Sequence, residues 1–142
     1  MQSVLGDVFI NRDGEVPFSE VDKNQVVCLY FTAHWCPPCR AFTPILVEFY
    51  NDVNYPEKRM EVIQVSSDKD QEQFNEYFGP LPWLAIPFND PRLKNLKTQF
   101  NIKGIPVLIL LNRDGTLALG SARADVQNEG PPCYDKWTKL VN

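Results

Sequence analysis

The 142-residue sequence has no run of lysine or arginine and no long apolar stretch, and each absence excludes a class of protein. The lack of basic runs, together with a formal net charge of −4, argues against binding to nucleic acids or anionic membranes, because a protein that binds them needs a basic patch. The lack of a long apolar stretch excludes a membrane-spanning helix. Residues 1–7 also lack the basic and apolar segments of a signal peptide. We expect a single monomeric domain over residues 1–142, located in the cytoplasm, without nucleic acid or membrane partners.

Histidine and cysteine are also scarce. There is one histidine, and of the four cysteines only Cys36 and Cys39 are close in sequence, which is too few for the disulfide framework of a secreted protein. In a reducing compartment such a pair is a redox couple or half of a metal site. A zinc site needs two further ligands, and Cys28, Cys133 and His34 form no second close pair, so we favour the redox couple and expect no metal.

Hydrophobic periodicity predicts an α/β fold. Apolar runs predict strands at residues 8–10, 26–31, 62–65, 107–111 and 116–119, and helical spacing predicts helices at 36–53, 68–78, from Asp90 onward and around Trp137. Asp68 is the predicted cap of the second helix, and Pro44 is expected to kink the first. Residues 79–88 are predicted to form a proline-rich loop. Because buried strands alternate with helices and a hairpin closes the end, we expect a central mixed β-sheet flanked by helices.

The cysteine pair lies where strand 26–31 leads into the first long helix. Unpaired N–H groups and the positive end of the helix dipole favour a thiolate at this point, which identifies Cys36 as the nucleophile and Cys39 as the resolving cysteine. Cys36 would open a substrate disulfide, and Cys39 would attack the resulting mixed disulfide. Pro37 and Pro38 lack N–H groups and stiffen the turn between the two cysteines.

The string Ala33-His34-Trp35-Cys36-Pro37-Pro38-Cys39-Arg40 resembles the thioredoxin superfamily, and Pro-Pro followed by arginine is typical of its tryparedoxin and nucleoredoxin branch. Segments 82–88 and 104–106 and the hairpin with Asp114-Gly115 agree with this resemblance. It implies a thioredoxin fold and a cis peptide bond before Pro106, facing the cysteines. It also implies that Ile105 offers its backbone to an extended substrate, as an added strand would.

Two positions depart from the patterns of these families. Thioredoxins carry a buried carboxylate six residues before the nucleophile, where this chain has Tyr30, so the proton acceptor for Cys39 is left open. Tryparedoxins tend to carry tryptophan where this chain has Ser67, which is closer to the nucleoredoxin pattern. A dedicated role with trypanothione therefore does not follow.

Several further residues allow two interpretations. The predicted substrate-binding residues are Trp35, Pro37, Pro38, Arg40, Ile105, Pro106 and Trp83. Trp35 and Trp83 could instead pack on the protein body, and Arg40 could support the Cys36 thiolate or be an ordinary surface arginine. His34 and Cys28 are interpreted as structural, and Cys133 as a partly buried helix-start residue in preference to a regulatory thiol.

These observations predict a protein-disulfide reductase that cycles Cys36 and Cys39 between dithiol and disulfide, with a role in cell redox homeostasis. No cofactor is expected besides this redox-active disulfide. The expected partners are disulfide-containing proteins such as peroxiredoxins, with a low-molecular-weight dithiol, glutathione or a reductase as electron donor. The alternative is a redox-sensing interaction module with little turnover.

Overall fold

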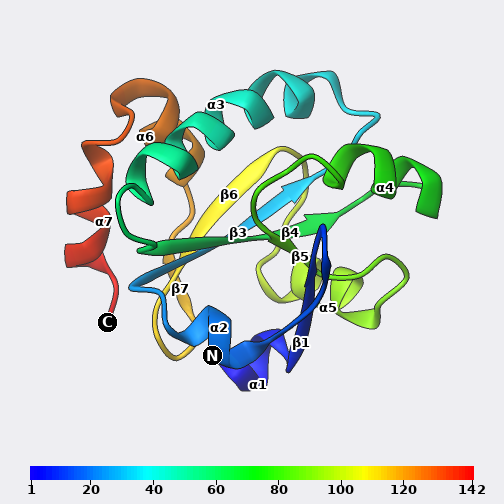
Figure 1. Ribbon diagram of the computed structural model, residues 1–142, viewed down its shortest axis with the longest axis horizontal. Helices are drawn as coiled ribbons and strands as arrows, with labels where there is room; N and C mark the ends of the chain where they lie inside the picture. The colour runs from blue at the N-terminus through cyan, green and yellow to red at the C-terminus, as the bar shows by residue number, and fades with distance from the viewer.

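The computed structural model describes residues 1–142 and contains one seven-stranded mixed sheet (Figure 1). The strands are β1 (Val8–Asn11), β2 (Gly14–Pro17), β3 (Val26–Thr32), β4 (Met60–Ser66), β5 (Leu84–Ala85), β6 (Val107–Leu111) and β7 (Leu117–Leu119). Their order is β2-β1-β5-β4-β3-β6-β7. Strand β3 pairs in parallel with β4 and antiparallel with β6, which makes it the central strand.

Seven helices accompany the sheet. They are α1 (Gln2–Leu5), α2 (Phe18–Asp22), α3 (Pro37–Val53), α4 (Gln71–Phe78), α5 (Pro91–Gln99), α6 (Ala122–Glu129) and α7 (Cys133–Leu140). Helices α3, α4, α6 and α7 contribute to one hydrophobic core, and α1, α2 and α5 to the other (Figure 1). Because side chains alternate along a strand, β3 sends Cys28 and Tyr30 into the first core, and Leu29 and Phe31 into the second. None of the helices combines the length and the apolar character needed to cross a membrane.

The mixed sheet flanked by helices is confirmed, and so are most of the long elements. All seven residues of β3 are buried, as a strand covered on both faces requires. Helix α3 runs without interruption through Pro44, and α5 begins after its predicted cap, Asp90. The missed elements are α1, α2, α6, β2 and the two-residue β5, which interrupts the predicted proline-rich loop. Strand β5 is held by pairing of Leu84 with Ile63 and of Ala85 with Ile10, which local sequence does not reveal.

The predicted cap of α4 was wrong by two residues. Asp70 is the N-cap, and its Oδ1 accepts a hydrogen bond from the Gln73 N–H at 2.8 Å. The Asp68 carboxylate instead accepts from the backbone N–H of His34 at 2.6 Å and from the Ser66 hydroxyl at 2.7 Å. Asp68 therefore ties the end of β4 to the segment that follows β3, next to the cysteine pair.

We predict that Asp70→Ala lowers the free energy of unfolding by about 1 kcal/mol, because it removes the acceptor for the first-turn N–H of Gln73. Asp70→Asn keeps a side-chain oxygen at the same position and should stay close to the wild type. Urea unfolding of both variants measures the difference. Equal stability of the two variants would show that the cap does not stabilise α4.

Candidate active site

Cys36 is the N-cap residue of α3, where its sulfur meets the start of the helix. Pro37 and Pro38 occupy the first two helical positions and have no N–H, so the amide of Cys39 is the first donor that the helix offers. This N–H donates to Cys36 Sγ at an N···S distance of 3.3 Å. A hydrogen bond of this kind is stronger when the accepting sulfur is a thiolate than when it is a thiol.

The two cysteines differ in their access to solvent. The exposed fraction is 5% for Cys36 and 0% for Cys39, and neither forms a disulfide. Burial, and to a lesser extent the hydrogen bond with Cys36, raises the pKa of Cys39 to about 11. Cys36 is therefore the sulfur of the pair that a substrate can reach, and Cys39 is held as a thiol behind it.

Four buried hydroxyl groups, those of Tyr30, Thr32, Thr43 and Tyr77, form a network beside Cys39. The Thr43 hydroxyl donates to the Cys39 carbonyl oxygen at 2.9 Å and lies 2.7 Å from Tyr30 Oη and 2.6 Å from Tyr77 Oη. Tyr77 Oη also lies 2.7 Å from Thr32 Oγ1. Although burial dominates the pKa of Cys39, a hydrogen bond from the Thr32 side chain acts in the opposite direction and lowers it.

This network has a chemical consequence for the position that holds a carboxylate in thioredoxins. Burial raises the pKa of both Tyr30 and Tyr77, so both phenols are neutral at physiological pH. No carboxylate takes part in the network. The groups that hydrogen-bond with the Cys39 thiol are Cys36, the Thr32 hydroxyl and the Ala33 backbone, and none of them is a carboxylate.

The loop before β6 faces the cysteine pair. The Ile105–Pro106 bond is cis, as expected, and the Ile105 carbonyl oxygen lies 3.9 Å from Cys36 Sγ. Ile105 also packs against the small apolar cluster of Ala33, Cys36 and Cys39. The backbone N–H groups of residues 103–105 have no hydrogen-bond partner within the chain. A main-chain edge with free donors thus lies beside the nucleophile.

Trp35 lies on the surface next to Cys36, with 45% of its area exposed. Its indole N–H donates to the Ser67 carbonyl oxygen at 2.9 Å, which fixes the ring over the end of β4. The Lys69 ammonium lies 5.6 Å from the ring centroid. An exposed and oriented aromatic ring at this place fits the predicted substrate contact, which remains a prediction.

Trp83 does not form a substrate surface. It is fully buried, its indole N–H donates to Gln64 Oε1 at 2.9 Å, and it packs edge-on against Tyr30 and Tyr50. The structure therefore corrects its placement among the substrate-binding residues and supports the packing alternative. A polar partner for the buried indole N–H, Gln64, explains why this large side chain is tolerated in the core.

The remaining candidate residues divide into exposed and buried ones. Arg40 is exposed and its side chain forms no hydrogen bond or ion pair, so its support of the thiolate remains a prediction. The ring of His34 packs edge-on against Tyr77, which agrees with a structural role. Cys28 and Cys133 are fully buried, and burial raises the pKa of both thiols. The interpretation of Cys28 as a core residue is confirmed, whereas Cys133 begins α7 as predicted but is fully and not partly buried.

Sequence reasoning missed Thr32, Thr43 and Tyr77 as parts of the site. Thr43 lies one helical turn after Cys39, and this spacing was the one available signal.

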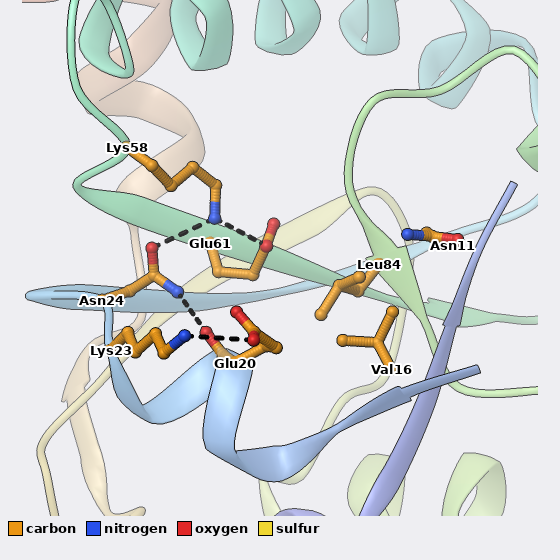
Figure 2. Close-up of a pocket in the computed structure, with 8 residues that line it drawn as sticks. All are labelled: Asn11, Val16, Glu20, Lys23, Asn24, Lys58, Glu61 and Leu84. Atoms are coloured by element: carbon orange, nitrogen blue, oxygen red, sulfur yellow. Dashed lines mark hydrogen bonds and ion pairs between the residues drawn. The ribbon is translucent and has the colours of Figure 1, made fainter. Parts of the chain in front are cut away.

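The largest cavity, about 460 Å³, lies away from the cysteine pair, near the amino ends of β3 and β4 (Figure 2). There the charged groups pair with each other, Lys58 with Glu61 and Lys23 with Glu20. No three His, Cys, Asp or Glu side chains gather in a way that could hold a metal ion.

Comparison with known proteins places these features in a family. A family model described as thioredoxin-like matches residues 24–117. Probable nucleoredoxin 1 of Arabidopsis thaliana is 42% identical over 133 residues, which cover 92% of this chain and 23% of that protein. This chain spans less than a third of the length of the nucleoredoxins that it matches.

Solved tryparedoxin structures share the fold. Tryparedoxin from Trypanosoma brucei has a TM-score of 0.84 at 35% identity, with 94% of this chain and 92% of the other covered. A tryparedoxin II in complex with glutathionylspermidine has a TM-score of 0.85 at 32% identity, with 94% of each chain covered. With its mixed sheet, flanking helices and Cys36–Cys39 pair at the start of α3, the chain has a thioredoxin fold and belongs to the tryparedoxin and nucleoredoxin branch of the thioredoxin superfamily.

Proposed function

We propose that this domain is a thiol–disulfide oxidoreductase that reduces disulfides in protein substrates, with Cys36 as the nucleophile and Cys39 as the resolving cysteine. The observation that carries the proposal is the environment of Cys36 Sγ. It accepts the first N–H that α3 offers, and it is the one sulfur of the pair with exposed surface. Family membership supports the same chemistry.

The reaction has two exchange steps. The Cys36 thiolate attacks one sulfur of the substrate disulfide, so that a Cys36–substrate bond forms and the other substrate sulfur leaves as a thiolate. Cys39 then loses its proton and attacks Cys36 Sγ, which forms the Cys36–Cys39 disulfide and releases the second substrate thiolate. The substrate gains two electrons and the cysteine pair loses two. An external thiol must return them for a further cycle.

The free main chain of the loop before β6 supports docking of an extended substrate. The N–H groups of residues 103–105 have no partner in the chain, and the Ile105 carbonyl oxygen is directed at Cys36. Hydrogen bonds from a substrate backbone to this edge would hold its disulfide beside Cys36 Sγ. Such docking does not depend on the substrate's side chains, so several proteins could be accepted.

The partners follow from the same chemistry. A tryparedoxin II binds glutathionylspermidine, and by similarity a low-molecular-weight thiol of the glutathione kind is a candidate electron donor for this chain. Disulfide-containing proteins, peroxiredoxins among them, are candidate acceptors. The reaction is placed in the cytoplasm, where reduced thiols are abundant, and uses no cofactor besides the cysteine pair.

We predict that the domain accelerates insulin reduction by dithiothreitol and that Cys36→Ser removes the whole catalysed component, because no other exposed sulfur can attack the substrate. Turbidity of the released insulin B chain measures the rate. Cys133→Ser is the matched control, since Cys133 is buried away from the pair and its loss should leave the rate unchanged. A wild-type rate no higher than that of Cys36→Ser would contradict the enzymatic function and favour a redox-sensing interaction module.

We predict that the resolving step speeds up with pH, because burial, the largest cause of the raised Cys39 pKa, persists in the mixed disulfide and leaves Cys39 largely protonated at pH 7. Below that pKa the thiolate fraction rises about tenfold per pH unit. With 5,5′-dithiobis(2-nitrobenzoate), Cys36 releases one thionitrobenzoate and Cys39 releases the second, so the second phase in stopped flow should show this slope between about pH 6 and 9.

Two variants separate the steps of this assay. Cys39→Ser should release a single equivalent and stop as the mixed disulfide. Thr32→Val removes the hydroxyl that lowers the Cys39 pKa, so it should slow the second phase several-fold at a given pH and leave the first phase unchanged. A second phase that does not change with pH would show that ionisation of Cys39 does not limit the resolving step.

A further inference from the structure

A groove runs along one side of the nucleophile, at the carboxyl ends of β3 and β4. Its volume is about 220 Å³, and we name it the Trp35–Ile105 groove after the residues at its two borders. Trp35 precedes Cys36 in the chain, and the Ile105 carbonyl oxygen lies 3.9 Å from Cys36 Sγ. The groove is therefore where the groups that flank a docked disulfide would lie, at the end of the sheet where α/β proteins bind ligands.

The charged groups that line this groove are all positive. Lys97 of α5 and Lys103 of the following loop are among its lining residues, and no aspartate or glutamate is. Neither lysine has a carboxylate within ion-pair distance, whereas Lys23, Lys58, Arg92 and Lys136 elsewhere in the chain all do. In the largest cavity, by contrast, each lysine is neutralised by a neighbouring glutamate (Figure 2).

Lys97 is partly buried, which makes the lack of a partner significant. Burial lowers the pKa of Lys97, because its ammonium group loses water without gaining a counter-ion. The charge of Asp68 acts on this pKa in the opposite direction, but Asp68 forms no ion pair with Lys97. Both Asp68 oxygens are already engaged, one by the His34 N–H and the other by the Ser66 hydroxyl. An incoming anion would supply the missing partner.

A third cation lies against the ring of Trp35. The Lys69 ammonium is 5.6 Å from the ring centroid, and Lys69 also has no ion-pair partner. Two unpaired lysines therefore line a small groove, and a third contacts the tryptophan at its border, in a chain whose net charge is −4. Isolated surface lysines are ordinary, but unpaired ones gathered around a half-exposed tryptophan beside a nucleophile form a local positive field.

We propose that the Trp35–Ile105 groove binds a carboxylate that flanks the reacting disulfide, so that acidic disulfide substrates react faster than basic ones. The proposal rests on the proposed function, because it concerns the substrate of the same two cysteines. The carboxylate lies against Lys97 and Lys103 while the Cys36 thiolate attacks the neighbouring sulfur and the other sulfur leaves as a thiolate. The same charges repel a substrate or thiol that carries a polyamine.

Three peptide disulfides that differ only in the residue next to cysteine, which is Glu, Gln or Lys, test this selectivity. Each is mixed with the reduced wild-type domain, and the second-order rate of thiol release is divided by the rate of the same peptide with dithiothreitol. This division removes the intrinsic reactivity of each disulfide. At low salt the Glu peptide should react about tenfold faster than the Lys peptide, in line with the modest strength of solvent-exposed ion pairs.

Salt and two sets of variants assign the effect to the groove. The ratio of the corrected Glu-peptide rate to the corrected Lys-peptide rate should fall toward one at about 1 M salt, where the Debye length is about 3 Å. Lys97→Gln combined with Lys103→Gln should lower the ratio several-fold. Lys139→Gln removes one positive charge from α7, remote from the groove, and should leave the ratio unchanged. A wild-type ratio of one or less, or a ratio that survives in the double variant, would overturn the proposal while leaving the reductase function intact. No reaction with any of the three peptides would instead overturn the reductase function and this proposal with it.

Discussion

The hydrogen bond from the Cys39 amide to Cys36 Sγ is the contact on which the rest of the site depends. It forms because α3 begins with two prolines, which leave the third amide as the first available donor. The position of this helix start is in turn set by β3, whose seven buried residues are paired on both sides. The nucleophile is therefore fixed by main-chain geometry and requires no charged side chain to hold it.

The same geometry separates the two thiols. Three residues into the helix, Cys39 enters the protein interior, where burial keeps it protonated. A buried carboxylate at this place would have to be desolvated together with the thiol, whereas hydroxyl groups satisfy one another and remain neutral. Tyr30 in place of an acid thus removes a fixed negative charge from the vicinity of Cys39. The groups that lower the pKa of Cys39 are then the Thr32 side chain and the Ala33 backbone, and neither is an acid.

The sequence was most informative where local pattern and fold agree. The apolar runs of β3 and β6, the helical spacing of α3 and the Cys36–Cys39 pair are all visible in short windows, and the resemblance supplied the cis bond before Pro106. The failures share one physical cause, which is contact between segments far apart in the chain. Thr43 and Tyr77 are 34 residues apart, and the two-residue β5 exists only through its neighbours in the sheet.

Trp83 and Asp68 illustrate the same point. Each was interpreted from its immediate surroundings, Trp83 as a residue of an exposed loop and Asp68 as a helix cap. Trp83 is instead buried behind Tyr30, and Asp68 joins β4 to the segment after β3 through the His34 N–H. Both roles are defined by partners that no local window contains.

The role of Asp68 also explains why the surface beside the nucleophile is positive. Its carboxylate acts electrostatically on Lys97, but its hydrogen bonds hold two chain segments together. If stability alone had determined this region, an acid able to pair with Lys97 would be expected, as occurs for Lys58 and Glu61 at the other end of the sheet. A partly buried lysine left without a counter-ion lowers stability slightly in the free protein. This loss of stability is consistent with a site in which a carboxylate of the substrate supplies the counter-ion for Lys97.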